Sequence, residues 1–192
     1  MRTEVHVHGN LYLCEGVTRR QVEAALRPWL EYLDVERMDE AKSLEPDQPG
    51  IVYHARDGLL EICWTGAVGR TFEQKLEETV QLLGPLTEQA AELELTYYHE
   101  NGGDETRLIF VGPTPEAIHE AQRRRMVEDV ASLLSRHFDE AAVGEVVALV
   151  NDLFRREWQS GGREAPAPEP SMPSVPPGRK PVSYTHLRAH ET

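Results

Sequence analysis

Several residue types and sequence signatures are scarce or missing from this chain, and each absence narrows the possible class of protein. Cysteine occurs only twice, at Cys14 and Cys63, and neither belongs to a C-x-x-C motif, a usage typical of a reducing cytoplasm. The N-terminus has no apolar signal region, and no apolar run approaches the roughly 18 residues that a membrane span needs. We therefore expect a cytoplasmic protein without membrane association.

An excess of positive charge is also missing. The formal net charge is −13, of which residues 1–113 contribute −11, with 21 acidic and 10 basic side chains. Residues 114–160 contribute −3. Such a surface repels phosphates, so sequence-independent binding to DNA or RNA is not expected. The acidity favours solubility and is compatible with a basic partner.

Signatures of phosphate and nucleotide binding are absent as well. The segment Gly66-Ala-Val-Gly-Arg-Thr71 joins a strand to a helix N-terminus, where backbone N–H groups and Arg70 could hold an anion. It is shorter than a P-loop, has Arg in place of Lys, and contains no G-x-G-x-x-G. A tight turn before a helix explains its residues. Near His99, in Tyr97-Tyr-His-Glu100, no nucleophile is placed by the sequence, so a catalytic triad is not predicted.

The C-terminal part of the sequence differs in composition from the rest. Proline and small residues dominate residues 161–181, which predicts an extended or disordered Pro-rich tail. Residues 182–192 (VSYTHLRAHET) match the in-frame translation of a common transposase-based sequencing adapter. We interpret this run as an artefact and leave its His186 and His190 out of any metal hypothesis. A single α+β domain is then expected over residues 1–160.

Apolar periodicity and capping signals predict seven elements followed by two helices. The first strand begins near Glu4, and a capping box at Thr18–Gln21 opens a helix that Pro28 should kink or split. The remaining elements are a hairpin across Asp57-Gly58, a helix opened by a second capping box at Thr71–Gln74 and ended at Gly84-Pro85, a hairpin formed by residues 93–99 and 107–111, and two helices capped by Thr114 and Asp139.

The order βα-ββ-α-ββ predicts a ferredoxin-like split βαβ sheet followed by a two-helix C-terminal extension. The first strand would lie between the third and the fourth. Apolar side chains of these strands would pack beneath the first two helices: Val5, Val7, Leu60, Ile62, Trp64, Leu93, Leu95 and Tyr97. The second face would carry Glu4, His6, His8, Glu61, Cys63, Thr65, Glu94, Thr96 and Tyr98. The terminal helices, a second copy of the chain, or nothing could cover that face.

The most distinctive polar feature is His6-Val-His8, whose two imidazoles project from one face of a strand. They could supply half of a zinc or nickel site, completed by Cys63 or Glu61 from the adjacent strand. Solvated or interface histidines are the simpler explanation of the pair, since no further ligand is fixed by the spacing, and a pH-sensitive interface is a further interpretation. We predict no resident cofactor, with a divalent-metal site at His6, His8, Cys63 and Glu61 as the alternative.

The two terminal helices have the strongest amphipathic pattern in the chain. We expect their apolar stripe to pack in the core, with a protein-interaction surface as the alternative. The run Arg123-Arg-Arg125 cannot line one side of a helix, because consecutive residues diverge by about 100°. It predicts a solvated helix face neutralised by Glu120, Glu128 and Asp129.

Five short stretches resemble a family of small uncharacterised bacterial proteins, a domain of unknown function. They are residues 4–9 (EVHVHG), 49–53 (PGIVY), 61–66 (EICWTG), 96–100 (TYYHE) and 110–115 (FVGPTP). The resemblance would cover the chain to about residue 160. It implies a bacterial accessory protein and brings no activity with it.

These features together predict a non-enzymatic protein-binding or self-assembly module that uses the open sheet face or the terminal helices. A small metal-dependent enzyme or metal sensor built on His6 and His8 is the first alternative. An acidic decoy that mimics DNA is the second, although its acidic residues are interleaved with Arg and apolar side chains.

Overall fold

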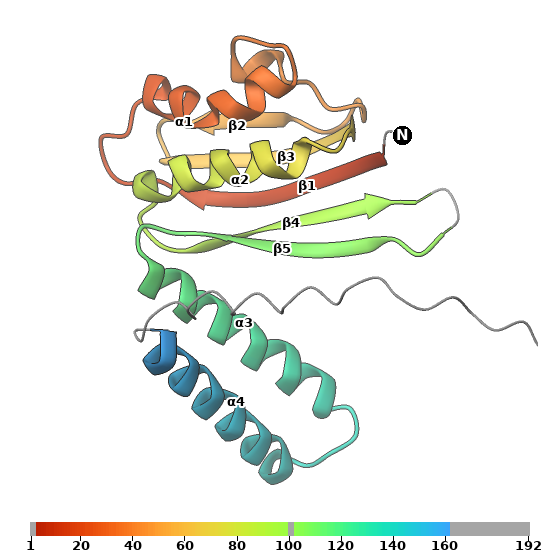
Figure 1. Cartoon of the computed structure of the whole chain (residues 1–192), viewed down its shortest axis with the longest axis vertical. Coiled ribbons are helices and arrows are strands. Elements are labelled where there is room, and N and C mark those ends of the chain that lie inside the picture. Colours follow the sequence, from red (N-terminus) through yellow and green to blue (C-terminus); the bar gives the residue numbers. More distant parts are fainter. Residues whose placement is uncertain (1–2, 100–101, 162–192) are drawn as a thin grey trace, which may run out of the picture.

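The central strand of the fold is β1 (Thr3–Tyr12), which pairs with β3 on one side and β4 on the other. The computed structural model describes residues 3–99 and 102–161 (Figure 1). All strands belong to one antiparallel sheet in the order β2-β3-β1-β4-β5. The α+β class is therefore confirmed, and the first strand lies between the third and fourth as expected. The Pro-rich tail from residue 162 and residues 182–192 lie outside the described residues.

The other elements follow in chain order. They are α1 (Arg19–Tyr32), the short 3₁₀ helix η1 (Met38–Glu40), β2 (Gly50–His54), β3 (Leu59–Val68), α2 (Phe72–Leu83), the 3₁₀ turn η2 (Gly84–Leu86), β4 (Ala91–Tyr98), β5 (Glu105–Val111), α3 (Pro115–Leu134) and α4 (Glu140–Gly161). Figure 1 shows α1 and α2 side by side over one face of the sheet, while α3 and α4 form a hairpin that leaves the sheet beyond β5.

Helix α1 begins with the predicted capping box and continues through its internal proline. The Thr18 hydroxyl accepts from the Gln21 N–H, and the Gln21 side chain accepts from the Thr18 N–H. Pro28 does not split the helix. The N–H of Trp29, next to the proline, donates to Thr79 Oγ1 of α2 over 3.1 Å. A hydroxyl of the neighbouring helix thus provides an acceptor where proline disturbs the hydrogen-bond ladder.

The second predicted capping box is wrong. Thr71 stands at the N-cap of α2, but its side chain makes no capping hydrogen bond. Its backbone is already helical (φ −88°, ψ −4°), whereas a capping side chain acts from an extended N-cap residue. The Gln74 amide donates to Glu78 instead, at 3.1 Å. Thr114 and Asp139 do cap their helices, accepting from the N–H groups of Ala117 and Ala142.

The two faces of the sheet have the composition that strand alternation predicts. All eight side chains expected beneath α1 and α2 are buried, and Trp29, Trp64 and Phe72 pack against one another at ring-centroid distances of 5.4 to 6.0 Å. The second face departs from expectation at Thr65, which is 2 % exposed. Ser43 donates to the Thr65 carbonyl and the Thr65 hydroxyl donates to Gln48, so the segment before β2 covers this position.

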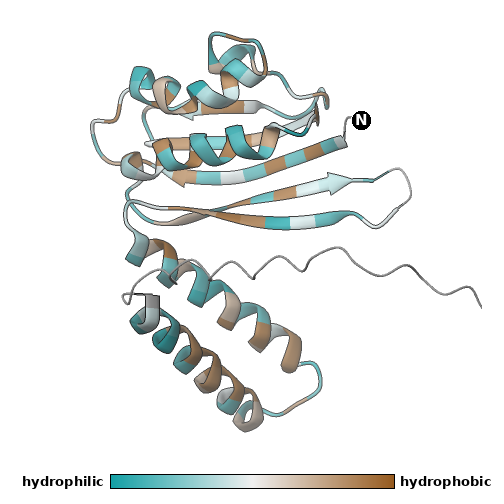
Figure 2. Ribbon diagram, in the orientation of Figure 1, coloured by the Kyte–Doolittle hydropathy of each residue, from teal (hydrophilic) through white to brown (hydrophobic). Residues whose placement is uncertain are grey.

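The terminal hairpin lies outside the core, which corrects the expectation of core packing. Its helices are also less amphipathic than α1 and α2, so the expectation that they have the strongest amphipathic pattern is wrong. Within the described residues, the cluster of buried apolar side chains ends at Val111, and neither α3 nor α4 contributes to it. Helix α3 touches β4 and β5, and α4 packs on α3. The hairpin therefore leaves the second sheet face uncovered, and brown apolar positions recur along both of its helices in Figure 2. None of the described helices combines the length and apolarity required to cross a membrane.

Candidate functional site

The first candidate surface is the uncovered sheet face around His6 and His8. Their imidazole rings stack with a centroid distance of 6.1 Å and an interplanar angle of 21°. In the strand register, His6 lies opposite Thr65 on β3, and His8 lies opposite Cys63 on β3 and Glu94 on β4. His6 Nδ1 is 2.9 Å from Thr65 Oγ1. The structure thus places both histidines and Cys63 on one face, as the alternation predicts.

The electrostatics of this face favour neutral side chains. Partial burial, followed by the proximity of His8, lowers the pKa of His6 below its ordinary value of 6.5, with Glu94 opposing the shift. Burial raises the pKa of the Cys63 thiol, and the carboxylates of Glu61 and Asp47 act in the same direction. A neutral imidazole is able to bind a metal ion, but a thiol must first lose its proton to do so.

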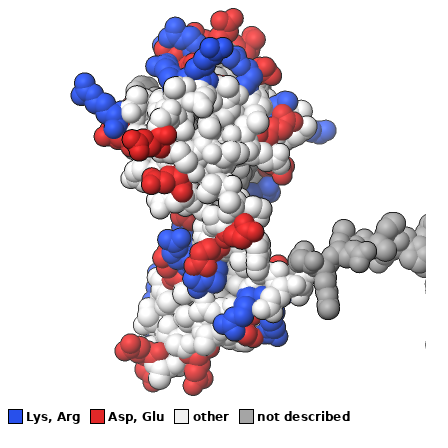
Figure 3. Space-filling view, turned by 90° about the vertical axis from the view of Figure 1, so that its left-hand side faces the viewer, with Lys and Arg blue, Asp and Glu red and all other residues white. Residues whose placement is uncertain are grey.

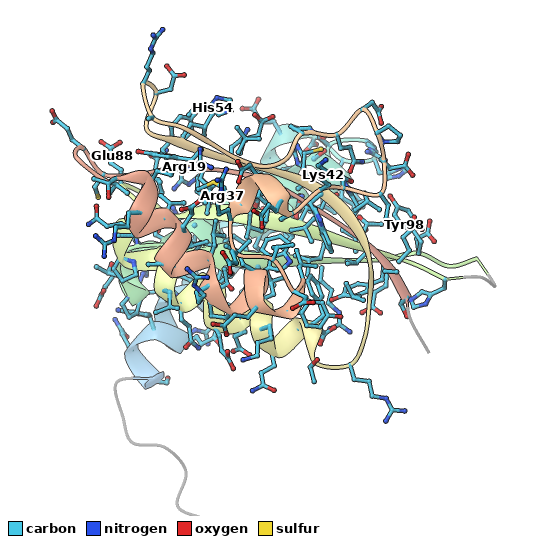
Figure 4. All side chains as sticks on the ribbon, turned by 90° about the horizontal axis from the view of Figure 1, so that it is seen from above. Arg19, Arg37, Lys42, His54, Glu88 and Tyr98 are labelled. Carbon is cyan, nitrogen blue, oxygen red and sulfur yellow. The ribbon has the colours of Figure 1, made fainter. Side chains whose placement is uncertain are left out.

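Glu61, the fourth predicted ligand, interacts with a residue that the sequence did not single out. Glu61 lies opposite Asn10 in the register, and its Oε2 is 2.8 Å from His54 Nε2 of β2. His54 points to the side of the sheet away from α1 and α2 (Figure 4). In residues 3–99 and 102–161, no group of three or more His, Cys, Asp or Glu side chains is arranged to hold a metal ion. The metal site stays a prediction.

The second candidate is a cavity of about 340 Å³ at the N-terminus of α2. It brings together two segments that were considered separately in the sequence, Gly69-Arg70 and Tyr97 with His99, and adds Glu73, Glu105 and Arg107. Arg107 donates to Glu73 Oε1 (3.0 Å) and to Glu105 Oε1 (2.7 Å), and its guanidinium lies 5.6 Å from the Tyr97 ring centroid.

This cavity is not suited to binding an anion through Arg107. The two carboxylates already neutralise that guanidinium. Burial raises the pKa of Tyr97, and Glu73 raises it further. The phenol is therefore neutral at physiological pH, and its buried ring serves the packing of the sheet.

The third candidate is the α3–α4 hairpin, which is held together by a few polar and aromatic contacts. His119 Nε2 is 3.2 Å from the Phe154 carbonyl oxygen, and its ring lies 4.7 Å from that of Trp158. Arg123 donates to Glu120 on its own helix and to Asn151 on α4. These contacts show which sides of the two helices face each other.

Arg125 does not lie on a purely solvated helix face, as the sequence predicted, because it also contacts the sheet. Its guanidinium binds Asp129 on α3, as expected, but also Glu92 on β4. This ion pair joins the middle of α3 to the sheet. Only the three-dimensional fold brings Glu92 to α3, since 33 residues separate Glu92 from Arg125.

The hairpin leaves many of its large apolar side chains exposed. None of the residues of α3 is buried, and large apolar side chains of the hairpin are between 38 % and 59 % exposed. They are Met126, Leu133, Phe138, Val146, Leu149, Leu153 and Trp158. In Figure 3 the hairpin forms a lobe below the body of the sheet, with acidic and basic side chains mixed over the visible surface.

The structure thus defines a small α+β protein with a self-contained sheet core and a projecting helical hairpin. The chain belongs to the Family of unknown function (DUF6806), whose model matches residues 3–155. The resemblance to a domain of unknown function is therefore confirmed. Neither the curated proteins nor the solved structures include a match to this chain.

Proposed function

We propose that this protein is a non-enzymatic protein-binding or self-assembly module and that the α3–α4 hairpin is its binding element. The observation that carries the proposal is the separation of the hairpin from the core. Among the described residues, Val111 is the last member of the buried apolar cluster in sequence order. The exposed apolar side chains of the hairpin come after it in the chain. A helix pair that adds nothing to the core and exposes Leu, Val and Met is suited to burying them against another protein.

The energetics support this interpretation. Complete burial of one Leu, Val or Met side chain contributes roughly 1.5–3 kcal/mol. Leu149 and Leu153 are about half exposed, so covering each of them is worth about 1 kcal/mol. A partner that covers several such side chains gains a few kcal/mol from apolar burial, which is a useful contribution to specific association.

The extent of the family match gives independent support. It runs from β1 through α3 and into α4, ending at residue 155. The hairpin is therefore part of the domain that the family shares.

The two free cysteines, Cys14 and Cys63, support our further proposal that the protein acts in the bacterial cytoplasm.

Site-specific photo-crosslinking tests the proposed function. A photoreactive residue at Leu153, within the full chain in living cells, should give a covalent adduct with another polypeptide chain. The matched control is Ala148, an exposed position of α4 that points about 140° away from Leu153. We expect adducts from Leu153 and none from Ala148. The absence of adducts from Leu153 would contradict a binding role for the hairpin.

Metal binding by the open sheet face remains a second proposal, supported by the stacked His6 and His8 rings. A thermal-shift panel of Zn²⁺, Ni²⁺, Mn²⁺ and Mg²⁺ tests it, because specific binding to the native state raises the melting temperature with metal concentration. A rise that disappears in the His6→Ala/His8→Ala variant would support a metal site. A rise that survives in that variant would exclude these two ligands.

The alternative of an acidic protein that mimics DNA gains no support from the surface, because acidic and basic side chains are mixed over the face shown in Figure 3.

A further inference from the structure

Five of the seven exposed apolar side chains of the hairpin share one side of it; of the other two, Trp158 contacts His119 between the helices and Phe138 lies in the connection. Successive residues of an α-helix turn by about 100°, which places Met126 and Leu133 within about 20° of each other on α3. Val146, Leu149 and Leu153 fall within about 60° of one another on α4. His119 and Arg123 contact α4 and so mark the side of α3 that faces α4. Relative to that side, the apolar groups of α3 and α4 both point to the same side of the hairpin. We call Met126, Leu133, Val146, Leu149 and Leu153 the apolar face.

The opposite side of the hairpin is polar. The same helical geometry places Glu120 and Arg124 of α3 there, together with Asp152 and Arg155 of α4. Arg155 pairs with Asp152 on its own helix at 3.5 Å. The hairpin thus has a polar side suited to water and a side that carries the five apolar residues. The same geometry places Arg156 within about 20° of Leu149 and Glu157 within about 40° of Leu153, so charged side chains border the apolar face at the C-terminal end of α4.

We propose that the apolar face binds a second copy of this chain, so that two hairpins form an antiparallel four-helix bundle; this inference rests on the proposed binding role of the hairpin. A two-fold axis brings the same surface of both copies together. Two helix pairs packed face to face give the common arrangement of a four-helix bundle, in which apolar side chains from all four helices fill the centre.

The area of the face suits such a dimer. Helices α3 and α4 contain 20 and 22 residues, which corresponds to a length of about 30 Å at 1.5 Å per residue. Two adjacent helices of about 10 Å diameter cover a width of roughly 20 Å. The hairpin therefore offers roughly 600 Å² on each copy, or 1,200 Å² in total, which is the lower limit for stable and specific interfaces.

The distribution of charge favours a copy in the antiparallel orientation. Residues 1–113 carry a formal charge of −11, so two sheet bodies placed next to each other would repel. The hairpin extends away from the sheet, and the loop between α3 and α4 lies at its far end (Figure 1). When two hairpins pair antiparallel, the acidic bodies lie at opposite ends of the bundle, where salt screens their repulsion.

Sedimentation of the full chain over a wide range of protein concentration tests the dimer. We expect a monomer–dimer equilibrium whose dissociation constant rises about a hundredfold or more in the Leu149→Glu/Leu153→Glu variant, because carboxylates would be buried without partners. The control Ala141→Glu/Ala148→Glu adds the same two charges to exposed positions on the other side of α4. It should dimerise as the unmodified chain does.

Crosslinking provides a second measurement that does not require charge in the interface. Cys14 and Cys63 are first replaced by Ser, and a single cysteine is then introduced near the middle of α4. Leu149→Cys should form a disulfide-linked dimer on oxidation, and Ala148→Cys should not. A monomer at every concentration, or a dimer that persists in Leu149→Glu/Leu153→Glu, would overturn the inference.

The failure of this inference differs from the failure of the proposed function. A monomeric chain whose Leu153 crosslinks in cells to a different protein overturns the second copy as occupant and keeps the binding role. A monomeric chain that gives no adduct at Leu153 overturns both.

Discussion

At the scale of single residues, His6 is the side chain on the open sheet face whose charge is coupled to folding. Burial lowers its pKa below 6.5 in the folded chain, so near that pH the unfolded chain binds more protons. The contribution of neutral His6 to folding stability is therefore fully present above the pKa of the unfolded chain. It declines as the pH falls through the lower pKa of the folded chain. Between about one pH unit above and one below 6.5, we expect the free energy of unfolding to decrease less in His6→Gln than in the unmodified chain.

Urea denaturation at the two pH values measures this difference. Gln122→Asn serves as the control, since Gln122 is exposed on α3 and neither side chain titrates. It should keep the pH dependence of the unmodified chain. If His6→Gln also keeps that dependence in full, His6 does not couple protonation to folding.

At the scale of elements, the hydroxyl of Thr79 links α1 to α2 by a hydrogen bond. Thr79 Oγ1 accepts from the Trp29 N–H (3.1 Å) and donates to the Lys75 carbonyl (2.9 Å), and Thr79 is completely buried. Thr79→Val keeps the shape but removes the acceptor next to Pro28, so we expect a loss of about 1–3 kcal/mol in the free energy of unfolding. Thr106→Val, on the exposed part of β5, should change it by less than about 0.5 kcal/mol. Equal effects of the two substitutions would contradict this role of Thr79.

The elements also show what the sequence could and could not predict. Alternation at a period of two predicted which side of β1, β3 and β4 is buried, because neighbouring residues of a strand point to opposite faces. The capping box at Thr18 depends on four consecutive residues and was predicted for that reason. The similar residues at Thr71 fail because the turn before α2 holds that backbone in a helical conformation.

The contacts that sequence patterns missed depend on how side chains and loops are arranged in three dimensions. The covering of Thr65 by Ser43 and Gln48, and the pairing of Glu61 with His54, depend on how loops and edge strands lie on the sheet. The amphipathic pattern of α4 showed that an apolar face exists, but its burial depends on what lies nearby. The pattern led us to expect core packing, but it is also compatible with an exposed binding surface.

At the scale of the whole molecule, the chain divides its apolar residues between a closed core and an exposed face. Burial of the core is complete without α3 and α4, since its last member among the described residues is Val111. The links between hairpin and sheet include the pairing of Arg125 with Glu92 and the contacts of α3 with β4 and β5. An ion pair that is partly exposed contributes only modestly to stability. The sheet body is thus expected to fold independently of the hairpin.

A chain ending at Pro113 tests this independence. We expect it to keep a cooperative thermal transition and the near-ultraviolet circular dichroism of packed Trp29 and Trp64, because both rings lie in the core that remains. Its melting temperature should fall by a few degrees, which corresponds to about 1 kcal/mol of lost contacts. A chain ending at Gly161 is the control and should melt as the full chain does. Loss of the cooperative transition on removal of the hairpin would show that α3 and α4 stabilise the sheet and that the sheet body does not fold independently.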